Sequence, residues 1–174
     1  EEVLTTAEGA APPVVFSPDG GTLIFAAQAE EQTFDLFALD LRNGNRITPI
    51  TRTPDSFEYA AAFSPDGRWL ALQSDESGRA EIYVQPYPGP GRRIQLSTAG
   101  GTFPVWGRDG REIFFRSAAR DWSRVAVEAG ATFDAGVPEA LFPIAFGTGN
   151  SVRRVAITPD NQGFLAEISS ATTA

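Results

Sequence analysis

A short turn motif that returns four times along the chain is the feature that most restricts its fold. Two copies are identical, Phe16–Gly20 and Phe63–Gly67, and both read FSPDG. Two looser copies, WGRDG and ITPDN, begin at Trp106 and Ile157. The aspartates of the four copies, at positions 19, 66, 109 and 160, are 47, 43 and 51 residues apart. A period of about 40 to 50 residues is typical of the four-stranded blade of a β-propeller.

The chemistry of the motif predicts a tight hairpin turn. Proline presets φ near −65° (roughly), and the aspartate carboxylate accepts hydrogen bonds from nearby backbone N–H groups. Glycine then closes the turn in the left-handed conformation. The last copy has Asn161 in place of glycine, and asparagine tolerates that conformation. Arg108 replaces the proline of the third copy, so that turn is less preorganised. We expect left-handed backbone at Gly20, Gly67, Gly110 and Asn161.

Apolar runs flank each turn and have the length of strands. The second repeat gives the clearest set of four, at residues 59–63, 69–72, 81–84 and 93–97. Its first two runs are apolar on both faces, which is typical of strands covered from both sides. The fourth run alternates between apolar and polar residues, which indicates an outer strand with one solvated face. In the first repeat Pro49 lies in the fourth run, and because proline cannot donate to a ladder, we expect that strand at an edge.

These patterns predict an all-β chain, a β-propeller of four-stranded antiparallel blades with three full blades and partial blades at both ends. A single domain would span residues 1–174, with blades at about 12–51, 57–98, 102–146 and 151–174, and with 1–6 as a closing strand. Three arrangements stay open: a very small ring closed by the two terminal segments, part of a larger ring, or two chains that complete each other. An open end would expose a sheet face and favour association, so a homo-oligomer is one expected partner state.

Charge and composition argue against several classes of function. The formal net charge is −8, and all 14 basic residues are arginines, without a basic stripe. A nucleic-acid partner or an anionic membrane surface would favour a basic surplus. No apolar run approaches the roughly 20 residues of a membrane helix, so no membrane insertion is expected. The chain lacks Met and a signal-peptide pattern, and we interpret it as a processed chain or a piece of a longer one.

The chain contains neither His nor Cys, which removes most catalytic arrangements. A Ser-His-Asp triad and the usual zinc sites are unavailable. We therefore predict no enzyme, and no catalytic, cofactor-binding or metal residues and no cofactor. A hydrolase that uses paired carboxylates is the alternative. Two acidic groups are interpreted as solvated loops, with calcium binding as the alternative. They are Glu30, Glu31 and Asp35 in the first repeat, and Asp75, Glu76 and Glu81 in the second.

Three residues are candidates for contact with a protein or peptide partner. Trp122 falls in a polar stretch, residues 118–123, beside Arg120. An exposed tryptophan next to arginine is a typical recognition hot spot, although Trp122 could instead anchor the loop on its own blade. Tyr87 lies between two prolines at a predicted rigid turn, where it would either stiffen the turn or contact a partner.

The turn motif together with the sequence GRAEIYV at residues 78–84 resembles the TolB-type, WD-like propeller repeat. IYVQPYPG at 82–89, followed by STAGG at 97–101, is similar to propeller domains fused to bacterial serine/threonine kinases or other signalling modules, as is TFDAGVPEALF at 132–142. The resemblance implies a sensing or protein-interaction role, in a periplasmic or extracytoplasmic location. The chain itself has no kinase signature and no lysine. Such repeats share turn and core residues, so the resemblance assigns no active-site residue.

Three hypotheses follow. The first is a non-catalytic binding module of a larger bacterial signalling protein. The second is the propeller part of a carboxylate-dependent hydrolase, which requires two carboxyl groups that converge in a cleft. The third is a propeller fragment that associates with itself.

Overall fold

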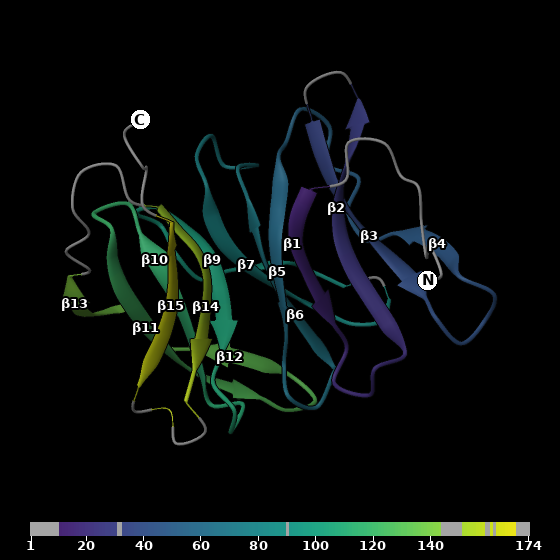
Figure 1. Ribbon diagram of the computed structural model, residues 1–174. Coiled ribbons are helices and arrows are strands. Elements are labelled where there is room, and N and C mark those ends of the chain that lie inside the picture. The colour runs from purple at the N-terminus through teal and green to yellow at the C-terminus, as the bar shows by residue number, and fades with distance from the viewer. Residues whose placement is uncertain are drawn as a thin grey trace.

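The computed structural model describes residues 11–30, 33–89, 91–143, 151–158, 161 and 163–169. Strands joined by turns make up this part of the chain, and Figure 1 shows them as successive antiparallel sheets. The first sheet has the order β1 (Ala11–Phe16), β2 (Thr22–Glu30), β3 (Thr33–Asp40) and β4 (Arg46–Pro49). The second has the order β5 (Glu58–Phe63), β6 (Trp69–Ser74), β7 (Glu81–Pro86) and β8 (Ile94–Gln95). None of the described residues forms a helix long and apolar enough to cross a membrane.

The third sheet has a divided outer strand. Its path is β9 (Gly101–Trp106), β10 (Glu112–Ser117), β11 (Asp121–Ala129) and β12 (Phe133–Ala135), and β13 (Glu139–Pro143) also pairs with β11. Residues 136–138 separate β12 from β13, so these two short strands share the outer position of the blade. The last sheet pairs β14 (Ser151–Ile157) with β15 (Phe164–Ser169).

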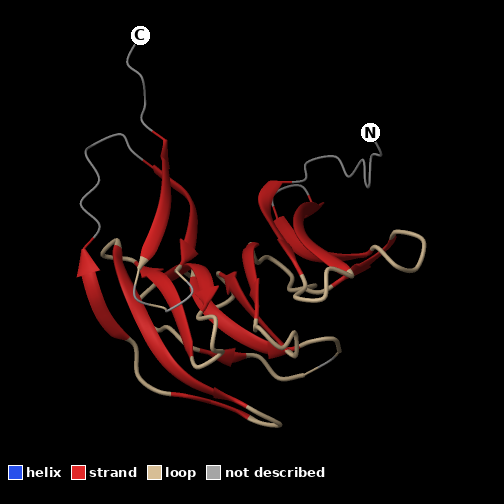
Figure 2. Ribbon diagram, turned by 60° about the horizontal axis from the view of Figure 1, so that its bottom comes forward, coloured by secondary structure: helices blue, strands red, loops and turns tan. Residues whose placement is uncertain are grey.

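The described part of the chain is thus an all-β partial propeller of three four-stranded blades followed by a half-blade, which confirms the predicted fold class. Figure 2 shows the sheets following one another along an arc, with the first blade standing apart from the two-stranded sheet. Residues 1–6, the predicted closing strand, lie outside the described residues. The strand that contains Pro49 is β4, at the edge of the first sheet, as the proline predicts.

The turn motif adopts the predicted backbone in all four copies. The closing residues have positive φ, at 68° for Gly20, 73° for Gly67 and Gly110, and 58° for Asn161. In the first copy the Asp19 carboxylate accepts hydrogen bonds from Ser17 Oγ at 2.6 Å and from the Gly21 amide at 3.0 Å. In this copy the aspartate is therefore bonded within its own turn.

Successive turns also pack against one another. A Cβ atom placed on Gly67 would lie 3.6 Å from Cδ of Pro18 in the preceding turn, and Gly110 meets Pro65 in the same way. At the last junction Asn161 Nδ2 donates to Asp109 Oδ1 at 3.1 Å. The proline of one turn therefore packs beside the glycine of the next, and the repeat sets the spacing of the blades as well as the shape of each turn.

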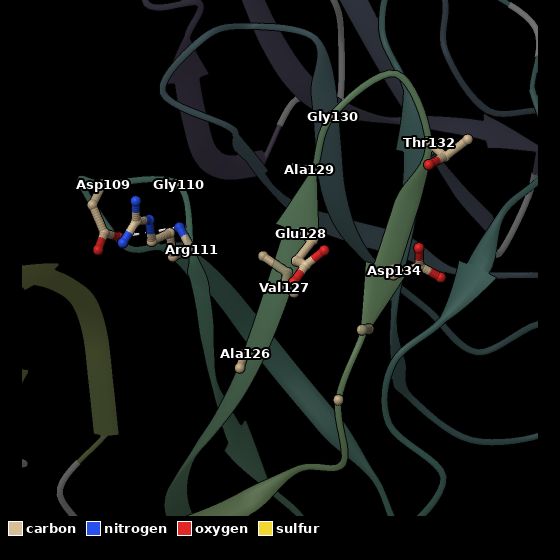
Figure 3. Close-up of a pocket in the computed structure, with 12 residues that line it drawn as sticks. Asp109, Gly110, Arg111, Ala126, Val127, Glu128, Ala129, Gly130, Thr132 and Asp134 are labelled. Atoms are coloured by element: carbon tan, nitrogen blue, oxygen red, sulfur yellow. Dashed lines mark hydrogen bonds between the residues drawn. The ribbon is translucent and has the colours of Figure 1, made fainter.

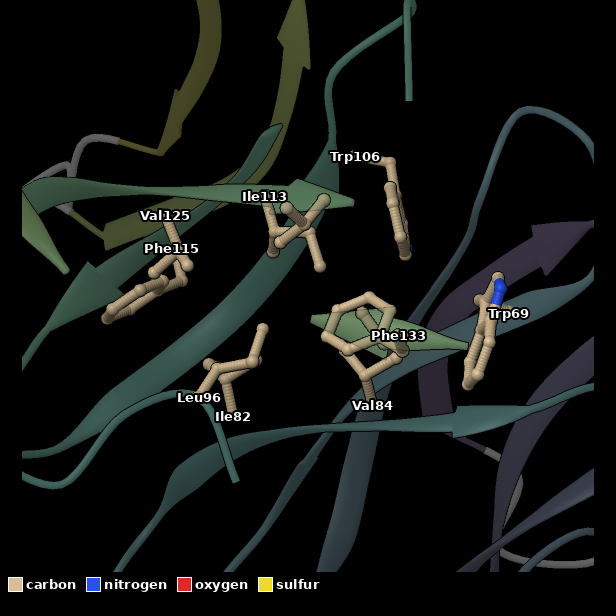
Figure 4. Packing of buried hydrophobic residues seen from close by; sticks show 11 residues of the cluster. Trp69, Ile82, Val84, Leu96, Trp106, Ile113, Phe115, Val125 and Phe133 are labelled. Carbon is tan, nitrogen blue, oxygen red and sulfur yellow. The ribbon is translucent and has the colours of Figure 1, made fainter. Parts of the chain in front are cut away.

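The hydrophobic core lies between blades. Ile24 and Leu36 of the first blade pack with Phe63 and Leu70 of the second. The second and third blades enclose a larger cluster, drawn in Figure 4. In that cluster the ring of Phe133 packs on two tryptophans, with its centroid 5.1 Å from that of Trp69 and 6.3 Å from that of Trp106. Phe133 belongs to β12, so the outer hairpin of the third blade reaches back onto the second.

Candidate functional site

Trp122 is buried, and the expectation that it lies in an exposed loop is wrong. The residue belongs to β11 and is 1% exposed. It packs with Phe114 and Ile157, between the third blade and the half-blade. The strand begins at Asp121, earlier than the polar neighbours suggested, because Trp122 pairs with Arg116 of β10 and Phe142 of β13. Trp122 therefore anchors blade packing and offers no surface to a partner.

Arg120 is exposed in the turn that joins β10 and β11. Its backbone has a φ of 68°, and its amide donates to the Ser117 carbonyl at 3.0 Å. Burial, together with the positive charge of Arg120 nearby, lowers the pKa of the Arg116 guanidinium. This turn is at the opposite end of its blade from the Asp109 turn. Arg120 is thus available at the surface, but the structure does not bring it together with Tyr87.

Tyr87 lines a groove of about 340 Å³ between the outer strand of the first blade and the β7–β8 connection. Its ring packs edge-on against Phe63 with centroids 4.9 Å apart, and its amide donates to the Arg68 carbonyl at 2.8 Å. The peptide bond to Pro88 is cis. The other residues that line the groove are Thr48, Pro49, Ile50, Gln85, Pro88 and Gly89. An aromatic ring with aliphatic and proline surfaces, free of charged side chains, is suited to an extended peptide.

A wider hollow of about 920 Å³ lies along the outer edge of the third blade, between the Asp109 turn and the β11–β12 hairpin (Figure 3). Glu128 of β11 and Asp134 of β12 stand directly opposite each other in this hairpin, and both are exposed. Like charges in this position repel each other. Arg111, whose amide binds the Asp109 carboxylate at 3.1 Å, lies on the other side of the hollow.

The aspartates of the first two turn motifs accept hydrogen bonds from residues of their own turns. Hydrogen bonds from Ser17 Oγ and the Gly21 amide lower the pKa of Asp19 to about 2, and Arg42 adds an ion pair at 2.7 Å. The Asp66 carboxylate accepts the equivalent bond from Ser64 Oγ at 2.6 Å and also has a lowered pKa. These carboxylates are therefore ionised at neutral pH and are bound to their own turns.

Glu81 and Asp35, which the sequence placed in solvated acidic loops, instead accept hydrogen bonds from hydroxyl groups within their own blades. Glu81 is fully buried and accepts hydrogen bonds from Ser97 Oγ and, at 2.9 Å, from the Gly100 amide. Asp35 accepts a bond from Thr51 Oγ1 at 3.3 Å in the first blade. In both blades the hydroxyl group, of Thr51 or Ser97, lies 16 residues after the acidic residue to which it donates. The same hydroxyl oxygen accepts a hydrogen bond from the backbone amide of the residue that follows the acidic one. The solvated-loop interpretation is thus wrong for Glu81, and this equal spacing is a sequence signal that could have revealed both pairs.

Glu58 is the centre of a buried polar network that sequence reasoning missed. Its side chain is fully buried at the start of β5, and Oε1 accepts from Ser74 Oγ at 3.1 Å and meets Arg93 Nη1 at 3.4 Å. The same guanidinium forms an ion pair with Glu76. Burial raises the pKa of Glu58, and the nearby Asp35 carboxyl of the first blade raises it further. A fully buried carboxyl group of the second blade therefore lies near a half-buried one of the first.

The second acidic loop does not assemble into a metal site. Asp75 accepts the Phe57 amide at 2.6 Å, Glu76 pairs with Arg93, and Glu81 is held by Ser97. Across the described residues, no group of three or more acidic side chains is placed to hold a metal ion.

Comparisons with known proteins place the chain among propellers. No family model matches it. An uncharacterized protein of Agrobacterium fabrum, Atu1656, is 30% identical over 109 residues, which cover 61% of this chain and 36% of that protein. The chain therefore spans little more than a third of this curated relative.

Solved structures share the fold at low sequence identity. TolB of Acinetobacter baumannii is 20% identical with a TM-score of 0.66, over 97% of this chain and 45% of that one. The β-propeller domain of Cps50 (Swd1) from Myceliophteria thermophila is 12% identical with a TM-score of 0.61, over 92% and 50%. The periplasmic gluconolactonase PpgL of Pseudomonas aeruginosa is 14% identical with a TM-score of 0.58, over 89% and 49%. The TolB-type resemblance is thus confirmed as a likeness of fold, and the chain spans about half of each structure.

Proposed function

We propose that this chain is a non-catalytic propeller module that binds an extended protein or peptide segment in the groove beside Tyr87. The observation that carries the proposal is the lining of that groove, where Tyr87, Pro49 and Ile50 offer apolar surface between two blades. Backbone groups of β4 lie at the edge of the first sheet, where a partner strand could also form hydrogen bonds. The module would serve as the sensor or interaction part of a larger bacterial signalling protein.

The wider hollow at the third blade is a weaker candidate for this role. It lies beside the half-blade, along β11. In this strand Ala126 and Glu128 are exposed, whereas Val127 between them packs in the core shared with the second blade. Its lining has no aromatic ring and carries the facing carboxylates Glu128 and Asp134. The Tyr87 groove lies between two complete blades and stays open whether or not the propeller is closed.

A displayed library of random 12-residue peptides tests the proposed groove. We expect selection on the purified chain to enrich peptides whose affinity, measured by calorimetry, falls at least tenfold in a Thr48→Arg variant. Thr48 lines the groove on exposed β4, so the arginine would fill the groove without disturbing the core. The matched control is Val137→Arg, at an 82% exposed position of the third blade, which should leave binding unchanged. Equal loss in both variants, or no enrichment, would contradict the proposal.

The raised pKa of Glu58, to which the nearby Asp35 carboxyl contributes, favours a carboxylate-dependent hydrolase as the second candidate. A carboxyl group with a raised pKa beside another carboxyl group is suited to acid–base chemistry. This alternative predicts turnover of fluorogenic glycosides or esters by the purified chain, and loss of that turnover in Glu58→Gln. The full burial of Glu58 and its link to Arg93 favour a structural role. Equal background rates in the wild type and the variant would exclude the alternative for these substrates.

A further inference from the structure

One polar side chain in the lining of the Tyr87 groove is held in a fixed orientation. Gln85 shares its face of β7 with Tyr83, which packs in the core between the first two blades. Its Oε1 accepts a hydrogen bond from Arg93 Nε at 3.0 Å. A guanidinium group carries only donors, so the oxygen of the Gln85 amide must face it. The amide nitrogen Nε2 has no acceptor in the described part of the chain, and its N–H groups are what Gln85 offers to the groove.

Arg93, which fixes this orientation, is itself held from both blades. Its Nη1 donates to Thr53 Oγ1 of the first blade at 3.2 Å and lies 3.4 Å from the buried Glu58 carboxylate of the second. It also forms an ion pair with Glu76. A flipped Gln85 amide would set N–H groups against the N–H groups of this guanidinium. Arg93 is therefore a positioning residue, and its positive charge behind the amide makes the Gln85 N–H groups stronger donors.

The rest of the groove lining is poor in groups that a partner strand would need. The hydroxyl groups of Thr48 and Tyr87 are its other polar side-chain groups, and neither has a hydrogen-bond partner among the described residues. Pro49 and Pro88 have no backbone N–H. Because β4 is only four residues long and includes Pro49, a ladder along it would be short and interrupted. The groove thus suits a segment that brings hydrogen-bond acceptors rather than one that must both donate and accept.

A proline-rich segment in the polyproline II conformation has these properties. This conformation has no internal hydrogen bonds, so its carbonyl oxygens are free to accept, and proline itself donates none. Proline rings pack on aromatic side chains in such complexes. Tyr87 supplies an aromatic ring that is braced by Phe63, with the centroids 4.9 Å apart. Charge complementarity favours the same ligand, because carbonyl oxygens carry partial negative charge and meet the Gln85 amide with Arg93 behind it.

We propose that the groove binds a proline-rich segment in the polyproline II conformation, with a proline ring on Tyr87 and a backbone carbonyl that accepts a hydrogen bond from Gln85 Nε2. This inference rests on the proposed function, because it names the class of segment that the same groove takes. Gln85 is the residue that selects an acceptor at this point, and Arg93 keeps its amide in the selecting orientation.

Two displayed 12-residue libraries test the class of ligand. One library fixes proline at every third position, and the other excludes proline and alternates β-branched with polar residues. We expect the proline library to yield peptides whose affinity falls at least tenfold in Thr48→Arg, and the proline-free library to yield none. If neither library gives binders that depend on Thr48, the groove and the proposed function both fail. Thr48-dependent binders from the proline-free library alone would leave the groove in place and overturn the proline-rich ligand.

Variants of Gln85 test the hydrogen bond. Gln85→Glu keeps the size of the side chain and can still accept from Arg93, but it has no N–H group to donate. Gln85→Met keeps a similar size without charge, and it decides the matter if the added carboxylate near Glu58 and Glu76 prevents folding. We expect each variant to weaken binding of the selected peptide about tenfold. The matched control is Gln95→Glu, at an exposed position of β8 outside the groove lining, which should bind normally. Normal binding by both Gln85 variants would refute the role of Gln85.

Nuclear magnetic resonance gives a readout that a merely structural role of Gln85 would not move. The side-chain amide signals of Gln85, assigned by their absence from Gln85→Met, should shift when the selected peptide is added, whereas those of Gln95 should stay in place. N-methylation of the peptide backbone supplies the second readout, because a polyproline II segment needs no N–H groups. We expect methylated peptides to bind within about twofold of the parent. A loss of binding at alternate methylated positions would show that the segment binds as a β-strand and would contradict the proposal.

Discussion

Gly67 holds the second turn in a conformation that other residues reach at a cost. Its φ is 73°, and the nearest neighbour of an added Cβ, Pro18 Cδ, would lie at an ordinary contact distance of 3.6 Å. We expect Gly67→Val to lower the free energy of unfolding by about 1–2 kcal/mol, through backbone strain at a β-branched residue. Urea unfolding provides the measurement. The matched control is Gly67→Asn, because Asn161 adopts the same conformation in the fourth turn, and it should lose clearly less. Equal losses would show that the strain argument is wrong.

Sequence reasoning worked for residues whose structure is local and failed for those with distant partners. The left-handed turn residues follow from five consecutive positions, and all four were predicted. The burial of Glu81 depends on Ser97 and that of Glu58 on Arg93, 35 residues away, so neither is visible within its own segment. The position of Trp122 was predicted wrongly because its polar neighbours Arg120 and Asp121 suggested a loop. In the structure Arg120 is a turn residue and Asp121 is the first residue of strand β11, so a polar composition did not mean a loop.

At the scale of elements, the short strand β12 fastens the third blade to the second. Phe133 is 7% exposed and packs on both Trp69 and Trp106. Removing a buried phenylalanine side chain costs about 3–5 kcal/mol in typical cores. We expect Phe133→Ala to lower the unfolding free energy by about 3 kcal/mol, at the lower end of this range because β12 is an edge strand that can adjust. We also expect amide exchange to accelerate more in β12 than in β10. A fluorescence-monitored urea titration, with Val137→Ala as the exposed control, checks this. A loss below about 1 kcal/mol would show that β12 does not fasten the two blades.

The buried carboxyl group of Glu58 predicts a dependence of stability on pH. A carboxyl group with a higher pKa in the folded state than in the unfolded state binds its proton more tightly when folded. Because burial raises the pKa of Glu58 above its ordinary 4.5, its contribution is favourable below that value and is lost as the pH rises through the folded pKa. Glutamine does not titrate, so we expect the unfolding free energy of Glu58→Gln to rise relative to that of the wild type as the pH increases from 4 to 7.

Asp19 supplies a control of opposite sign. Its pKa is lowered from 3.8 to about 2, so its stabilising contribution is present above 3.8 and is lost as the pH falls through about 2. Asp19→Asn should therefore lose stability relative to the wild type as the pH rises from 2 to 4. Chemical denaturation at several pH values measures both trends. A difference between Glu58→Gln and the wild type that stays constant from pH 4 to pH 7 would refute the assignment of Glu58.

At the scale of the whole molecule, the repeat predicts the number of blades but leaves their closure open. A period of 43 to 51 residues defines three blades and the start of a fourth, because each blade is specified by its own turn and strands. Closure depends on contacts between the two ends of the arc, and no local pattern encodes the distance between those ends. Phe16 is 57% exposed, whereas its equivalents Phe63 and Trp106 are buried against the preceding blade.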